Sequence, residues 1–216
     1  GISGALLVKD LDRPDRFLYV LLRPQWKSWL VKGAYIITIF GGLVTIKLID
    51  NIYGFNWNWL WVLGSIFSVL GAIYTAFLFA QARARDLWQS KWVSATHMLV
   101  HAIISGSFVL MIISPLSKNY MANFLLLSIT INIIIIMKEI LFPHNTPDSK
   151  KAIHLMTKGY YSKYFWLGIT LGSFIPIIML STQIGELVII AGVLSLIGNY
   201  LTEYVRIRIP QMIPLS

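Results

Sequence analysis

Long apolar stretches alternate with short polar segments along most of the chain. A bilayer core of about 30 Å takes about 20 apolar residues in a helix. A helix also satisfies its own backbone hydrogen bonds, which lipid cannot do. The pattern therefore predicts an all-α fold, a polytopic transmembrane helical bundle. Its six spans are expected at roughly Gly33–Ile49, Trp57–Ala80, Trp92–Ile113, Tyr120–Phe142, Phe165–Leu180 and Leu187–Val205.

The segments outside these spans predict the remaining organisation. Residues 1–8 are apolar but too short to cross a membrane, so we interpret them as the end of a preceding helix. Residues 9–32 are expected to form a loop, and Pro143–Tyr164 the longest loop. The tail around Pro210 is expected to be irregular. Because the other connections are short, we expect residues 1–216 to form a single integral membrane domain.

Composition and charge support the membrane interpretation. Hydrophobic residues make up 56% of the chain and charged residues only 12%, too few to cover a soluble protein of this size. A net charge of +9 would suggest nucleic acid binding in a soluble protein. Here all 18 Lys and Arg residues except Lys47 and Lys118 fall on one side of the predicted bundle. The positive-inside rule makes that side cytoplasmic, places the C-terminus there and indicates contact with membrane lipid rather than nucleic acid.

A few ionisable side chains lie inside the predicted spans. Burying such a group in a membrane costs free energy, so these residues are functional candidates. His97 and His101 are four residues apart and share one helix face. Glu139 and Glu203 lie in the inner third of the fourth and sixth spans. Histidine titrates near neutral pH, so these four residues can form a proton path. Structural histidines and haem or metal ligands are the other interpretations, although two histidines on one helix turn cannot bind opposite faces of one haem.

Simpler roles are also open for the polar residues of the spans. The two glutamates can reach water at the end of their helices or pair with Lys138 or Arg206. Asn132, near the middle of the fourth span, is expected to make an interhelical hydrogen bond. There is no cysteine, so an iron–sulfur cluster or thiolate-bound metal would belong to a partner.

A second candidate site lies at the opposite ends of the first two spans. Lys47 and Asp50 are three residues apart and can form a self-contained pair. Alternatively, Asp50, Tyr53, Trp57 and Asn58 line a polar pocket with flat apolar walls. Such a pocket suits a quinone head, which needs a hydrogen-bond donor, an acid that exchanges protons and flat apolar surroundings.

Four segments resemble the NrfD/PsrC family, which comprises membrane anchors of polysulfide-reductase-like and alternative-complex-III-like oxidoreductases. The first is similar to the family's D-L-x-R-P-x-R-F loop, which is followed by a serine and a helix-opening glycine. The others are individually weaker but occur in the family's order. The matching residues are Asp10–Phe17 (DLDRPDRF), Trp26–Trp29 and Gly33; Tyr74 and the basic turn ending in Trp88; His101–Gly106 (HAIISG); and Phe165–Gly168, Gly172, Pro176, Arg206 and Gln211.

This resemblance implies the last part of an eight-helix fold, with residues 1–8 closing its second helix. It implies a subunit of a bacterial or archaeal cytoplasmic membrane that binds quinone or menaquinone, with no haem or iron–sulfur cluster of its own. The implied partners are a ferredoxin-like iron–sulfur subunit and a molybdopterin or cytochrome subunit. The resemblance also adds Tyr74 to the quinone pocket and makes proton translocation an open expectation.

Two other functions remain as alternatives. A secondary transporter or channel could use the same polar cluster as a substrate path, although the chain shows no internal repeat of the kind found in many transporters. A haem-b membrane anchor is the other alternative, and the small number of histidines within the spans weighs against it.

Overall fold

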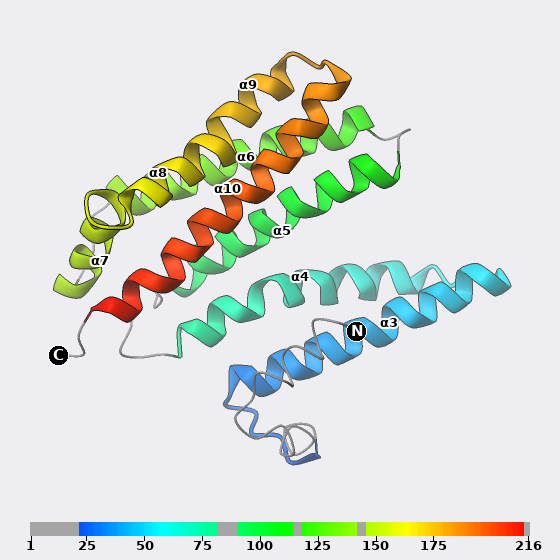
Figure 1. Cartoon of the computed structure of the whole chain (residues 1–216). Coiled ribbons are helices and arrows are strands. Elements are labelled where there is room, and N and C mark those ends of the chain that lie inside the picture. Colours follow the sequence, from blue (N-terminus) through cyan, green and yellow to red (C-terminus); the bar gives the residue numbers. More distant parts are fainter. Residues whose placement is uncertain (1–21, 82–89, 115–117, 142–145, 214–216) are drawn as a thin grey trace. The chain divides into compact units, whose positions relative to one another are not determined.

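The computed structural model describes residues 22–81, 90–114, 118–141 and 146–213. These residues are almost entirely helical and include no strand (Figure 1). They contain six helices long and apolar enough to cross a membrane, which confirms the all-α polytopic fold. The predicted end of a preceding helix and the D-L-x-R-P loop lie outside the described residues and stay predictions.

The chain divides into two compact units, residues 1–81 and residues 82–216, which we call unit 1 and unit 2. The described part of unit 1 is a hairpin of two helices, α3 (Trp29–Tyr53) and α4 (Trp59–Phe79). The turn between them begins at Gly54, whose φ of 73° lies in the left-handed region that favours glycine.

The open end of the hairpin is tied by one side chain and one close contact. Gln81, just after α4, accepts a hydrogen bond from Trp29 N at 2.9 Å and donates one to Lys27 O at 3.1 Å. Nearby, the ring of Tyr74 packs directly on Gly33, where a Cβ atom would overlap the ring. Glycine at this position therefore lets α3 approach the face of α4 that carries the tyrosine.

The described part of unit 2 contains four helices that can span a membrane and one shorter helix. One of the four, Ser162–Ser181, is continuous but changes from α to π and back to α. In chain order its elements are α5 (Lys91–Ile113), α6 (Lys118–Leu141), α7 (Pro147–Thr157), α8 (Ser162–Ile169), the π-helical turn η4 (Thr170–Phe174), α9 (Ile175–Ser181) and α10 (Gly185–Met212).

Helix α10 packs against α5 on one side and against α8, η4 and α9 on the other (Figure 1). Helix α6 also packs against α5 and against α9 and η4. Helices α6 and α10 therefore lie diagonally opposite, and each presents a face to the interior of the bundle. Two apolar clusters fill parts of this interior. The first apolar core consists of Val100, Ile104, Phe108, Met111, Leu125, Ile129, Leu180, Val188 and Ala191. The second consists of Ile136, Ala152, Met156, Phe165, Ile169, Val205 and Ile209.

Glycines bring α8 and η4 unusually close to α10. A Cβ atom on Gly172 would lie 2.7 Å from Gly198 Cα, closer than real Cβ atoms approach. Gly168 faces the same stretch of α10. The π-helical turn contains Gly172, and it ends where Ile175 N bonds to Thr170 O, five residues earlier, just before Pro176.

The structure corrects two predictions about the segments between spans. Pro143–Tyr164 is not simply a loop, because it contains α7. Thr146 caps this helix by accepting a hydrogen bond from Ser149 N at 3.2 Å, and the helix buries Ala152 and Met156 in the second apolar core. The tail around Pro210 is not irregular, since α10 continues to Met212. Pro210 lies two residues before the end of the helix and removes one α-helical hydrogen bond there.

Candidate functional site

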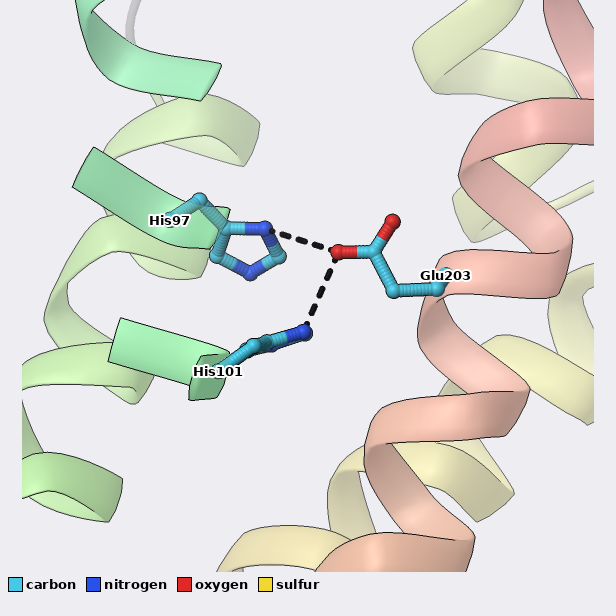
Figure 2. Close-up of side chains that lie close together, drawn as sticks. All are labelled: His97, His101 and Glu203. Carbon is cyan, nitrogen blue, oxygen red and sulfur yellow. Dashed lines mark ion pairs between the residues drawn. The ribbon is translucent and has the colours of Figure 1, made fainter. Parts of the chain in front are cut away.

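Three ionisable side chains meet inside unit 2. His97 and His101 project from one face of α5, and Glu203 projects toward them from α10 (Figure 2). His97 Nδ1 lies 3.4 Å and His101 Nδ1 lies 3.1 Å from the same oxygen, Glu203 Oε1. The two imidazole rings are themselves in contact, with centroids 4.1 Å apart. One carboxylate oxygen is thus shared by two histidines.

This geometry assigns the hydrogen-bonding roles of both rings. A carboxylate oxygen can only accept, so each ring faces Glu203 with an Nδ1–H donor. When an imidazole is neutral, its proton is then on Nδ1 and its Nε2 is an acceptor. The Nε2 atoms of His97 and His101 are both buried, and neither has a hydrogen-bond partner among the described residues. The cluster therefore has two acceptors that point away from Glu203 and can take a further donor.

A buried ion pair lies beside this cluster. Arg206 Nη1 on α10 donates to Glu139 Oε2 on α6 at 2.9 Å, so the pair reaches across the interior of the bundle. The Arg206 guanidinium also interacts electrostatically with Glu203 and His97. Of the partners that the sequence allowed for Glu139, the structure selects Arg206.

The charge of the histidine–glutamate cluster depends on the protons that its two rings carry. Both rings face the same oxygen of Glu203 with Nδ1, and an imidazole that takes up a proton becomes a cation beside this carboxylate. The cluster is therefore suited to holding a proton that the two rings can exchange through Glu203.

The same three residues could in principle hold a metal ion, since one ligand atom from each lies within 4.8 Å of the others. Histidines that bind a metal normally donate their second ring N–H to a carboxylate, a carbonyl or water. Among the described residues, neither His97 Nε2 nor His101 Nε2 has a carboxylate or carbonyl partner. The three side chains thus offer ligand atoms for a metal ion as well as acceptors for a proton.

The second candidate site lies at the turn of the unit 1 hairpin. Asp50 is buried, with Lys47 Nζ donating to its Oδ2 and Trp57 N donating to its Oδ1 at 3.0 Å. Its carboxylate thus fixes the turn between α3 and α4, in agreement with the self-contained pair. Tyr53, Trp57 and Asn58 are exposed around it. Exposed aromatic rings continue along this turn as a stacked series of Tyr53, Phe55, Trp57 and Trp59, with centroids 5.0–6.4 Å apart.

Tyr74 is not part of this turn. It packs on Gly33, which precedes Asp50 by 17 residues of α3. At about 1.5 Å of rise per residue, the two positions are about 25 Å apart along the helix. The structure therefore brings Asp50, Tyr53, Trp57 and Asn58 together and places Tyr74 at the other end of the hairpin.

A surface hollow on unit 2 includes none of the predicted site residues. Its volume is about 280 Å³, and its aromatic lining is typical of the membrane–water interface. The lining residues are Tyr160, Tyr161, Tyr164, Tyr200, Leu201 and Tyr204.

Sequence reasoning found the members of the buried cluster but not their connections. The i, i+4 spacing placed His97 and His101 on one face, and the structure adds that this face turns to Glu203. The role of Arg206 as the partner that crosses the interior was one of several possibilities. A usable signal existed, because Glu203 and Arg206 are three residues apart and therefore share a face of α10.

Six candidate spans and a buried ionisable cluster define a polytopic integral membrane protein with a charged interior. The sequence profile described as polysulphide reductase, NrfD, matches residues 1–214. The chain therefore belongs to the NrfD family, whose members are membrane subunits of respiratory oxidoreductase complexes. No curated protein and no solved structure matches the chain.

Proposed function

We propose that the chain is the quinone-reactive membrane subunit of a multi-subunit respiratory oxidoreductase. It binds quinone or quinol, menaquinone included, and exchanges electrons with an extrinsic ferredoxin-like iron–sulfur subunit. A molybdopterin or cytochrome subunit completes the enzyme. Membership of the NrfD family carries this proposal, because the family consists of membrane subunits of such complexes. The 216 residues contain no cysteine, which supports an iron–sulfur cluster held by a partner.

The turn of the unit 1 hairpin is the proposed quinone site. A quinone head needs flat apolar surfaces and a group that exchanges protons. The stacked rings around Trp57 offer the surfaces, and Asp50 offers the carboxylate. Tyr53 and Asn58 lie in the same turn. Tyr74 is about 25 Å away along α3 and does not contact the same quinone head.

The buried cluster of unit 2 is the proposed proton path. Reduction of a quinone takes up protons together with electrons, and oxidation of the quinol releases both, so a subunit that handles quinone has protons to move. His97, His101 and Glu203 can hold one proton among them, and Glu139 with Arg206 supplies the adjacent charges. The distribution of Lys and Arg supports an orientation in a bacterial or archaeal cytoplasmic membrane with this end of unit 2 and the C-terminus on the cytoplasmic side.

The quinone site is tested with Asp50→Asn in the purified complex. The variant keeps the size of the side chain and an oxygen for Trp57 N, but it cannot exchange the carboxyl proton. If Asp50 acts as the acid–base group, quinol turnover falls by about 100-fold or more, the usual contribution of such a group. Asp148→Asn is the matched control, because Asp148 forms the same kind of i, i+3 pair with Lys151 on α7. Normal quinol turnover by a fully assembled Asp50→Asn complex would show that Asp50 is not the acid–base group of a quinone site.

The proton path is tested with Glu203→Gln in proteoliposomes that contain the intact complex. The amide retains the shape of the side chain and an oxygen that can accept from both Nδ1–H groups, but it has no charge and cannot take up a proton. Proton uptake per quinol is expected to fall while quinone binding is unchanged. Glu186→Gln, in the exposed first turn of the same helix, serves as the control. Equal proton uptake by the wild type and Glu203→Gln would exclude this path.

A further inference from the structure

Buried polar residues recur at matching positions on the two helices that face each other across the interior of unit 2. The ion pair joins Glu139 of α6 to Arg206 of α10, which are 67 residues apart in the chain. Two further pairs of buried polar residues on these helices are also 67 residues apart in the chain. These pairs are Asn132 with Asn199 and Ser128 with Ser195.

Helix geometry turns this repeated separation into a spatial arrangement. Helices α6 and α10 run in the same direction, because their first halves meet in the first apolar core and their last halves in the second. Because Glu139 contacts Arg206, any other two residues of α6 and α10 that are 67 residues apart lie at the same height along the bundle as each other. Seven residues turn a helix by about 700°, only about 20° short of two full turns, and four residues turn it about 40° past one. Asn132 and Asn199 thus face the interior at a level about 10 Å from the ion pair, and the serines lie about 6 Å further on.

The two asparagines are buried and incompletely bonded. Asn132 is 2% exposed and Asn199 is 7% exposed. The acceptor Asn132 Oδ1 and the donor Asn199 Nδ2 have no hydrogen-bond partner in the part of the chain that the structure describes. Together with the Nε2 atoms of His97 and His101, they are all the buried side-chain polar atoms that lack a partner in the described ranges. All four atoms belong to helices that enclose one interior.

The serines continue the same polar face. Ser128 donates its hydroxyl proton to Phe124 O at 2.7 Å, and Ser195 donates to Ala191 O at 2.8 Å. Their oxygen atoms keep lone pairs that can accept a further hydrogen bond. Beyond the serines, α6 and α10 bury the apolar side chains Leu125, Val188 and Ala191. The ring of Phe108 packs on Gly192, one turn from Ser195.

We propose that the interior of unit 2 is a water-filled half-channel that extends the proton path from Glu203 to the middle of the membrane. This inference rests on the proton path of the proposed function. Water can donate to Asn132 Oδ1 and to both Nε2 atoms and can accept from Asn199 Nδ2, so one species satisfies all four buried atoms. From Arg206 to Ser195 the route covers about 16 Å, roughly half of a hydrocarbon core of about 30 Å. Phe108 and the first apolar core close its far end.

The first test is a high-resolution cryo-EM map of the intact complex. Ordered water is expected within hydrogen-bond distance of Asn132, Asn199, His97 and His101, and no water is expected beyond Phe108. A map in which the two asparagine amides bond directly to each other, with dry density around both Nε2 atoms, would overturn the half-channel. Continuous water past Phe108 would overturn its closed end.

The second test replaces both asparagines by leucine, Asn132→Leu with Asn199→Leu, in the complex in proteoliposomes. Leucine has a similar volume but no polar atom, so the fold is retained while the water chain loses two contacts. Proton uptake per quinol turnover is expected to fall at least about tenfold. Asn123→Leu, on an exposed face of the same α6, is the control and is expected to leave proton uptake unchanged.

The variants also separate failure of the half-channel from failure of the proton path. If Glu203→Gln blocks proton uptake and the double asparagine variant does not, the half-channel is wrong and the path through the histidine–glutamate cluster stands. If both variants take up protons normally, the proton path itself is wrong. Loss of proton uptake in both, with normal uptake by Asn123→Leu, supports the half-channel.

Discussion

The ion pair between Arg206 and Glu139 makes the sharpest prediction about stability. Its side chains are only 12% and 8% exposed, and they join α10 to α6 across the bundle. Removing one member of a buried pair leaves the other charge uncompensated and typically costs about 3–5 kcal/mol. Replacing both members by apolar side chains of similar size is often neutral, because the cost of burying the charges also disappears.

We therefore expect Arg206→Met to lower the free energy of unfolding by about 3–5 kcal/mol. The double variant, Arg206→Met with Glu139→Leu, should recover most of that loss. Recovery should be incomplete, since Arg206 also interacts with Glu203. The unfolding free energies can be measured by titrating the detergent-purified protein with SDS and following tryptophan fluorescence. The difference between the double variant and the sum of the single variants is the coupling energy of the pair.

Arg208→Met is the matched control, because Arg208 is exposed on the same helix and its guanidinium lies over the ring of Tyr204. Its cost should not exceed about 1 kcal/mol, the value of an exposed cation–π contact. If Arg206→Met costs no more than Arg208→Met, or if the effects at Arg206 and Glu139 are simply additive, the pair does not couple α10 to α6 and our reasoning fails.

Two further substitutions test the packing of unit 2. Gly198→Ala should destabilise the bundle by about 1–3 kcal/mol, because the added Cβ atom would overlap the backbone at Gly172. Gly41→Ala is the control and should be neutral or stabilising, since no atom lies within 4 Å of its added Cβ. Equal melting temperatures of the two variants in detergent would contradict the close contact between the helices. Thr146→Ala removes the cap on Ser149 N and should cost α7 about 1 kcal/mol, seen as faster amide hydrogen exchange in its first turn than in the wild type; unchanged exchange would show that the cap is not needed.

The spans were predictable because their signal is a property of composition. Lipid imposes one requirement on every spanning helix, so apolar runs identify all six spans of the described chain. Helix α7 was missed because its evidence is local chemistry rather than length. Thr146, Pro147 and Asp148 form a typical helix start, but the surrounding prolines made the whole segment resemble a loop. The continuation of α10 to Met212 was missed because Pro210 was taken to end the helix.

The candidate site was predictable only as a set of residues. The free-energy cost of ionisable groups in a membrane identified the candidates His97, His101, Glu139 and Glu203. The i, i+4 spacing predicted that the two histidines share a helix face. Contacts between helices depend on how the bundle packs, which no single-helix pattern contains. The separation of 67 residues identifies facing positions on α6 and α10 only once the contact between Glu139 and Arg206 shows how the two helices align. The roles of Asp50 and Tyr74 in quinone binding stay predictions.

The polar interior has a consequence for how the protein enters the membrane. Helix α10 contributes Ser195, Asn199, Glu203 and Arg206 to that interior, and it has the lowest mean hydropathy of the six candidate spans. A charged residue near the centre of an isolated span raises the cost of insertion by about 2.5–3.5 kcal/mol. Helices α5 and α6 are synthesised first, so their polar groups are already available when α10 leaves the ribosome. Insertion of α10 should therefore be a cooperative step that depends on the helices before it, and damage to those helices would leave α10 outside the bilayer.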